Sequence, residues 1–255
     1  MNKDKLKILF ITQDDPFYVK LFFEEFFKNY SDKVDILGVA ICPPMAKKSV
    51  SALIQQMYDF FGPIDFIRMC WRYLLAKLSG ENLKKLCKQN NIAVCEAKNP
   101  NSANFIDHWQ KQGIDVLVSV AAPYKFKEKL LKLAKIDCIN IHHAKLPRYQ
   151  GMMPNFWQMY HQEKNAGVTV HRMNEGIDQG DILLQKEVPV EADESLDHLI
   201  KRTKRMGAHF IMEALELIRQ GKAEYKPNDL SKGVYFCFPT KQHLVEFRRR
   251  GGKLL

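Results

Sequence analysis

The chain has 255 residues and a mass of 29.7 kDa, and 46% of its residues are apolar and 27% charged. This ordinary mixture excludes a fibrous or disordered chain, and the length favours one large domain. Lys and Arg outnumber Asp and Glu by 39 to 29, which gives a net charge of +10. A charge of this size indicates a phosphate-rich partner, a nucleic acid or an anionic membrane surface.

No targeting or membrane segment is expected. The first seven residues are polar, and the apolar run at 8–12 is too short for the core of a signal peptide. The longest apolar stretch, 60–78, is interrupted by charged residues and does not predict a membrane span. Six scattered cysteines without a CxxC pair predict buried, reduced thiols instead of disulfides or a metal site. We therefore expect a soluble, cytoplasmic protein that binds no metal.

The first 142 residues alternate between short apolar runs and segments with helical spacing. Such alternation predicts an α/β fold, a Rossmann-like and mostly parallel sheet with helices on both faces. Ligands of such sheets bind at the carboxyl ends of the strands. Strands are expected at 7–12, 34–42, 93–96, 115–122 and 138–142, and helices at 17–30, 81–91, 105–112 and 127–134.

The pattern changes after Pro147. Two β-rich runs, 168–173 and 181–190, are joined by a glycine-containing connection and predict an antiparallel hairpin near the C-terminal part. One long helix is expected at 196–219. We expect a catalytic domain at 1–225 with a helical insertion at about 45–80, followed by a short basic extension at 226–255.

Asn140 and His142 are the first candidates for chemistry. Residues two apart on a strand point to the same face, so the amide and the imidazole project together. An amide donor beside an imidazole can stabilise a developing oxyanion and move a proton. The alternative is that these polar residues only satisfy loop backbone at the end of the strand.

Asp178 is the second candidate, although an Asp between two glycines is usually a turn residue. The surrounding sequence favours a functional role for Asp178. An Asn-x-His strand end is followed by Leu146-Pro147-x-x-x-Gly, a Gly-Val-Thr strand and the run Gly176-Ile-Asp-x-Gly. This string, in which 36 residues separate Asp178 from His142, resembles the folate-dependent formyltransferase family of methionyl-tRNA, glycinamide ribonucleotide and sugar-amine formyltransferases.

The resemblance extends from about residue 92 to 217 and implies a folate-dependent enzyme. It implies that an amine attacks the formyl carbon of 10-formyltetrahydrofolate, with no metal involved. Asn140 would stabilise the oxyanion, His142 would carry the proton, and Asp178 would tune the histidine pKa or position a water. The implied cofactor contacts are Tyr124, Lys125, Phe126, Leu146, Pro147, Asn174, Glu175, Gly176 and Ile177.

The acceptor is the least defined part of the resemblance. Gln13 and Asp14, at the end of the first strand, are expected to contact it. This strand end contains no glycine, which argues against the phosphate cradle of the glycinamide ribonucleotide enzymes. About thirty residues follow Tyr225, too few for the C-terminal domain of the tRNA branch. A small amine, in particular an amino sugar on a nucleotide carrier, is the expected acceptor.

Other functions and partners stay open. A formyltetrahydrofolate hydrolase, a methionyl-tRNA formyltransferase-like enzyme and a non-catalytic folate- or nucleotide-binding module are the alternatives. The segment 54–78 is rich in aromatic residues and is interpreted as core packing, with a lid, a homodimer surface or a membrane-surface helix as the functional alternatives. No nucleic-acid-binding motif is present, and His143 is expected to point away from His142.

Overall fold

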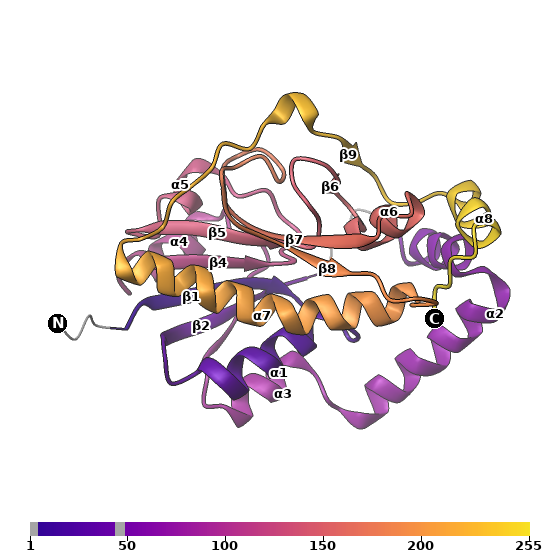
Figure 1. The fold of residues 1–255 in the computed structure, drawn as a ribbon. Coiled ribbons are helices and arrows are strands. Elements are labelled where there is room, and N and C mark those ends of the chain that lie inside the picture. The colour runs from indigo at the N-terminus through magenta and orange to yellow at the C-terminus, as the bar shows by residue number, and fades with distance from the viewer. Residues whose placement is uncertain (1–4, 44–48) are drawn as a thin grey trace.

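A computed structural model describes residues 5–43 and 49–255 of the chain (Figure 1). The first four residues of the polar N-terminal segment lie outside these ranges. Residues 45–48 of the expected insertion also lie outside them.

A seven-stranded sheet forms the centre of the fold, and it confirms the expected Rossmann-like α/β class (Figure 1). Its first five strands in space are parallel, and the last two are antiparallel to their neighbours. The antiparallel pair is the hairpin that the β-rich runs predicted. In spatial order the strands are β3 (Val94–Glu96), β2 (Asp35–Cys42), β1 (Lys7–Gln13), β4 (Val116–Val120), β5 (Asp137–His142), β7 (Asn165–Arg172) and β8 (Ile182–Pro189).

Helices cover both faces of the sheet. On one face lie α1 (Val19–Tyr30), α3 (Leu83–Gln89) and α7 (Leu196–Gln220), and on the other lie α4 (Ala103–Gln110) and α5 (Glu128–Leu131) (Figure 1). The rings of Phe22, Phe23 and Phe26 on α1 pack edge-on against Phe10 of β1, with centroids 5.1–6.1 Å apart. The apolar spacing that predicted α1 therefore reflects its buried face.

A third apolar cluster joins distant parts of the chain. It contains Phe60, Phe156, Leu244, Phe247 and Leu254. The elements around it were not predicted: β6 (Gln150–Gly151), α6 (Pro154–Tyr160), a 3-10 turn (Leu230–Lys232), β9 (Tyr235–Phe236) and α8 (Lys241–Arg249).

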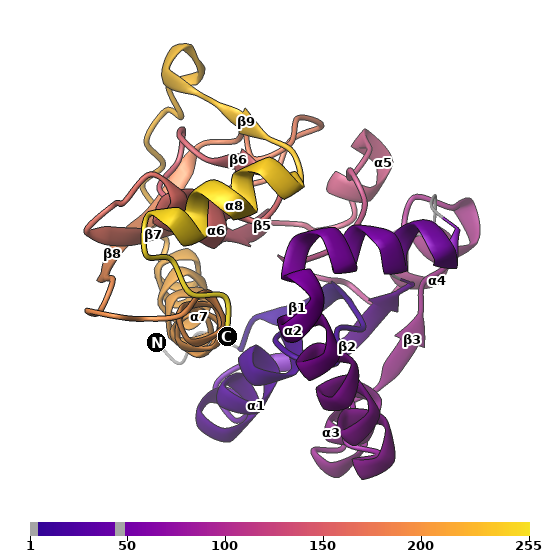
Figure 2. The same cartoon turned by 90° about the vertical axis from the view of Figure 1, so that its right-hand side faces the viewer.

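The segment after residue 225 packs against the rest of the fold at three places. Lys226 bridges to Ile182, β9 pairs with β6, and Lys253 bridges to Ser195 (Figure 2). The division of the chain at residue 225 stays a prediction.

The segment expected to be an insertion forms one long helical element, α2 (Val50–Ser79), which is bent at Gly62 (φ 69°, ψ 174°). The expected core packing holds for Phe60, which is buried, but it is wrong for Tyr58, Trp71 and Tyr73, which are 43%, 63% and 44% exposed. The segment stays this exposed because α2 lies at the side of the molecule (Figure 2), although the ring of Tyr73 still contacts that of Phe17, with centroids 6.4 Å apart.

All six cysteines are free thiols. Cys42, Cys87 and Cys138 are buried and Cys95 is half-buried, but Cys70 and Cys237 are exposed, so the expectation of burial is wrong for these two. Cys70 lies on the outer side of α2, and Cys237 lies in the connection that leads to α8. None of the helices in residues 5–43 and 49–255 combines the length and apolar character needed to cross a membrane.

Candidate functional site

The carboxyl end of β5 presents two polar side chains on one face. Ile139 and Ile141 point into the core beneath α1 and α7, so the alternation of the strand places Asn140 and His142 on the opposite face. Asn140 is half-buried and His142 is 6% exposed. The strand therefore brings an amide and an imidazole together, as the Asn-x-His pattern predicted.

Asp178 reaches the same place from the connection between β7 and β8. Its Oδ1 lies 3.5 Å from Nδ1 of His142, and its Oδ2 accepts a hydrogen bond from the backbone N–H of Gly151 at 2.9 Å. Its own backbone has a positive φ of 54°, and Nδ2 of Asn228 donates to its carbonyl at 3.0 Å. The side chain and the backbone of Asp178 are thus each held by a hydrogen bond, which a simple turn residue would not require.

His171 is a fourth member of this cluster, and the sequence did not single it out. It lies on β7 directly opposite Asn140, and its Nε2 is 3.0 Å from Nδ2 of Asn140 and 3.6 Å from Oδ1 of Asp178. Its Nδ1 donates to the carbonyl of Arg172 at 2.8 Å, so in the neutral ring Nε2 accepts from Asn140. One N–H of the Asn140 amide stays available for an incoming oxygen.

The protonation of the cluster follows from its contacts. Nε2 of His142 donates to the carbonyl of Tyr149 at 2.8 Å, so the neutral ring presents the lone pair of Nδ1 toward Asp178. Burial lowers the pKa of His142, and His171 and Lys204 lower it further, against the opposite effects of Asp178 and the Tyr149 carbonyl. His142 is therefore a neutral base near pH 7, ready to accept a proton on Nδ1.

Asp178 is the charged partner of this base. Burial tends to raise the pKa of Asp178, but the charge of His142 and contacts with His171 and Gly151 outweigh burial and lower it to about 2. A carboxylate that stays ionised beside Nδ1 stabilises the imidazolium that forms when His142 takes up a proton.

A second group of buried polar side chains lies behind β5. His143 points to the opposite face from His142, where it packs beneath Gly207 of α7, and neither of its ring nitrogens has a hydrogen-bond partner within the described residues. Lys204 of α7 is 9% exposed, and burial lowers its pKa to about 8 against the opposite effect of Asp15. It lies close enough to His142 and His143 for its charge to lower the pKa of both.

The two segments expected to hold the cofactor lie next to each other. The backbone N–H of Glu128, just after the segment of Tyr124, Lys125 and Phe126, donates to Oε1 of Glu175 at 3.2 Å. The first of these segments is fixed by Asn101, which bonds the Lys125 carbonyl and the N–H of Lys127.

The remaining cofactor residues take two different positions. Asn174 closes its own turn with Oδ1 on the N–H of Gly176 at 2.9 Å, and Ile177 is half-buried between that turn and Asp178. Leu146 and Pro147, which are joined by a cis peptide bond, line a cavity of about 440 Å³. Asn140, His142 and Asp178 are not among the residues lining this cavity, so contact of this turn with a cofactor stays a prediction.

Gln13 and Asp14 lie where β1 ends, at the same edge of the sheet as His142. Gln13 is half-buried and Asp14 exposed, and Oδ1 of the next residue, Asp15, accepts the backbone N–H groups of Phe17 and Tyr18 ahead of α1. The side chains of Gln13 and Asp14 are therefore not needed to start α1, and their contact with the acceptor stays a prediction.

A groove of about 630 Å³ opens between the first half of α2 and the connection from β9 to α8. Its apolar lining includes Met152 and Phe238, and its polar lining includes Gln55, Asp59 and Lys241. Met152 directly follows Gly151, the residue whose N–H binds Asp178. One end of the groove therefore lies near the cluster of Asn140, His142 and Asp178.

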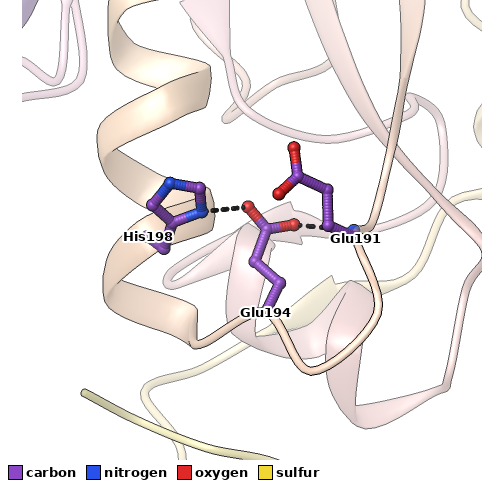
Figure 3. A group of neighbouring side chains, drawn as sticks. All are labelled: Glu191, Glu194 and His198. Atoms are coloured by element: carbon purple, nitrogen blue, oxygen red, sulfur yellow. Dashed lines mark hydrogen bonds and ion pairs between the residues drawn. The ribbon is translucent and has the colours of Figure 1, made fainter.

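Glu191, Glu194 and His198 form a trio with the spacing of metal ligands at the start of α7 (Figure 3). Both oxygens of Glu194 are already bonded by the guanidinium of Arg202, at 2.8 and 3.0 Å. Nδ1 of His198 and the N–H of Glu191 also bond this carboxylate. Since a guanidinium on the central ligand opposes a cation, we interpret the trio as a structural anchor of α7.

Comparison with known proteins identifies the family of the chain. Residues 74–215 match the family model described as formyl transferase. A methionyl-tRNA formyltransferase of Clostridioides difficile is 34% identical over 147 residues, which are 58% of this chain and 48% of that protein. The chain spans about half the length of the curated relatives it matches.

Solved structures of this fold are more distant in sequence. An N-formyltransferase from Helicobacter canadensis has a TM-score of 0.57 at 18% identity, covering 91% of this chain and 70% of its own. A glycinamide ribonucleotide transformylase from Symbiobacterium toebii has a TM-score of 0.60 at 14% identity, covering 88% and 95%. At these identities the likeness shows a shared fold. The family match covers more than half of the chain, and this protein belongs to the formyl transferase family.

Proposed function

We propose that this protein transfers a formyl group from 10-formyltetrahydrofolate to the primary amine of a small acceptor, an amino sugar carried by a nucleotide. The observation that carries the proposal is the cluster at the end of β5. Asn140 offers an N–H, His142 presents an unprotonated Nδ1, and Asp178 stays ionised 3.5 Å from that nitrogen. An amine attacking a formyl carbon needs these three functions.

The steps follow from the contacts. As the amine nitrogen bonds to the formyl carbon, negative charge grows on the formyl oxygen, and the free N–H of Asn140 donates to it. His142 takes the proton that leaves the amine, and Asp178 stabilises the resulting imidazolium. The bond between the formyl carbon and the donor nitrogen then breaks, and His142 returns the proton to that nitrogen.

The donor side is supported by the two adjoining loops that contain residues 124–128 and 174–178. They are held together by the contact between the Glu128 N–H and Glu175, and Asp178 ends the second loop. A donor lying between these loops would have its formyl group beside Asn140 and His142. The Helicobacter canadensis relative was solved with folinic acid, a folate, which agrees with a folate donor.

The acceptor side is supported by the groove beside Met152. Its volume of about 630 Å³ lies within the roughly 300–1,000 Å³ of small-molecule sites. An apolar lining that includes Met152 and Phe238, together with polar side chains such as Gln55 and Asp59, suits a flat base or a sugar ring. The Helicobacter canadensis relative was also solved with dTDP-3-aminofucose, a nucleotide-linked amino sugar.

A second acceptor class has its own support. Two relatives, 34% and 29% identical to this chain, are named methionyl-tRNA formyltransferases, which favours the α-amine of a charged tRNA. The net charge of +10 agrees with either acceptor, because both carry phosphate.

The deciding experiment incubates the protein with 10-formyltetrahydrofolate and one of three additions: a panel of nucleotide-linked amino sugars, methionyl-tRNA, or buffer. We expect consumption of the donor only with an amino sugar. Consumption with methionyl-tRNA alone would reassign the acceptor, and consumption in buffer would identify a hydrolase. Inertness in all three arms, with donor binding intact, would identify a binding module.

A further inference from the structure

The second half of α2 exposes a continuous row of large apolar side chains. We name this row, Ile64, Ile67, Trp71, Leu74 and Leu78, the α2 stripe. Its members are 72%, 68%, 63%, 45% and 74% exposed. The spacing of three, four, three and four residues places them on one face of the helix, in the a and d pattern of a helix–helix seam.

The inner face of the same half-helix is fixed to the protein mainly by polar contacts. Arg72 bonds Oδ1 of Asp197 on α7 at 2.5 Å. Asp65 accepts from Arg248 of α8 at 3.1 Å, and the same guanidinium bonds the carbonyl of Phe61 at the bend. Because these contacts set the rotation of the helix about its axis, the α2 stripe faces outward as a consequence of the folded structure.

The exposed face is too large for an isolated monomer. Fifteen residues of helix span roughly 22 Å. The α2 stripe together with Leu75, which is 48% exposed, presents on the order of 700 Å² of apolar surface, whereas monomers rarely expose more than a few hundred. Each partner in a standard interface buries roughly 800 Å², so this face has the size that a stable dimer needs.

The arginines on this half-helix argue against a lipid occupant. Helices that lie on membranes keep basic residues free to reach anionic headgroups. Here Arg68 bonds Asp65 at 3.3 Å, and Arg72 is held between Asp197 and the rings of Phe17 and Tyr18.

We propose that a second copy of this chain covers the α2 stripe, with the two stripes packed against each other about a two-fold axis. Such an interface is self-complementary, and an a/d seam is suited to pairing with its own copy. The residues of the seam differ from those of the groove, which is lined by the first half of α2. Pairing would therefore immobilise the helix that forms one wall of the groove without using its lining residues.

The test is the mass of the protein in solution, measured by sedimentation equilibrium across a range of concentrations. We expect twice the 29.7 kDa chain mass for the wild type. The variant Ile67→Glu/Trp71→Glu buries charge in the seam and should weaken self-association at least about a hundredfold. Val245→Glu replaces an apolar residue of α8 that is 61% exposed, and this control should stay dimeric.

Several results would overturn the proposal. One is a wild type that stays monomeric at every concentration. Another is a dimer that persists in the Ile67→Glu/Trp71→Glu variant. If that variant fails to fold by circular dichroism, Leu78→Glu at the end of the stripe replaces it, and a persisting dimer there contradicts the proposal equally. Sedimentation of monomer with phosphatidylserine vesicles, lost in the same variants, would identify lipid as the occupant and overturn it too.

Discussion

Replacement of Asp178 by Asn tests the charge that faces the proposed base. The change keeps the shape of the side chain, so the bond from the Gly151 N–H to Oδ2 can be retained on the amide oxygen. It removes the negative charge that lies 3.5 Å from Nδ1 of His142. The variant therefore separates the electrostatic role of Asp178 from its role in holding the loop.

The magnitude follows from the pKa of Asp178. A decrease from 3.8 to about 2 corresponds to roughly 2.5 kcal/mol in favour of the carboxylate. The charge of His142 is the largest of the lowering causes, ahead of contacts with His171 and Gly151. If it supplies about half or more of that energy, loss of the carboxylate should lower kcat by roughly tenfold to fiftyfold.

The assay is initial-rate formation of formylated acceptor across pH. Since Asp178 raises the pKa of His142, the acid limb of the kcat profile should move to lower pH in Asp178→Asn. Asp181→Asn, an exposed carboxylate three residues away, is the matched control and should behave as wild type. A kcat within twofold of wild type, or an acid limb that moves upward, would refute the reasoning.

The same substitution changes stability with pH. The pKa of Asp178 is depressed in the folded protein, so its stabilising contribution is present above the unfolded pKa of about 3.9 and is lost as pH falls toward 2. Chemical unfolding of Asp178→Asn should therefore depend less on pH between 4 and 2 than that of wild type. Equal slopes in this window would contradict the assigned ionisation.

Three further substitutions test other parts of the site. Lys204→Met removes a charge that lowers the pKa of His142, the proposed base, so the acid limb of the kcat profile should move to higher pH, opposite to Asp178→Asn; no movement would contradict the effect assigned to Lys204. Asn140→Ala removes the oxyanion donor, which typically costs about 2.7–4 kcal/mol, so kcat should fall at least about a hundredfold, while the exposed control Asn165→Ala keeps its rate. Gly180→Ala places a Cβ 1.8 Å from the carbonyl oxygen of Arg172, so the melting temperature and the activity of the variant should both fall. An unchanged melting temperature would show that the loop can shift to accommodate the methyl group.

Much of the central fold could be predicted from the sequence because its strands are short, almost entirely apolar runs. Buried parallel strands have this composition, and the intervening helices show the 3.6-residue spacing of a single buried face. The sequence also predicts that Asn140 and His142 lie on the same face of their strand, because side chains alternate between the two faces of any strand. Asp178 could be identified as a candidate only from the spacing of the longer motif, because its immediate neighbours in the sequence are those of an ordinary turn residue.

His171 and Lys204 depend on tertiary structure and were missed. The contact between His171 and Asn140 is set by the antiparallel register of β5 with β7, which joins residues 31 positions apart. The available signal was a histidine inside the apolar run Val168–Met173. Lys204 could have been noticed because it lies three and four residues before the buried Gly207 and Ala208 on α7.

The elements beyond β5 that were not predicted are short pieces held by tertiary contacts. β6 and β9 are two residues each, and α6 and α8 are held by the cluster around Phe156 and Phe247. A two-residue strand has no periodicity to read. In α2 the apolar pattern is visible in the sequence, but the sequence does not show which face of the helix is buried. The ion pairs Arg72–Asp197 and Arg248–Asp65 decide this, and they join residues far apart in the chain.

The most direct test of the central claim follows the formyl carbon itself. The protein is incubated with 10-formyltetrahydrofolate labelled with ¹³C in the formyl group and with a nucleotide-linked amino sugar, and the products are separated and observed by NMR. We predict that the label appears as a formamide on the sugar at a rate that depends on Asn140 and His142. Label recovered only as formate, or transfer that survives removal of both side chains, would contradict the account.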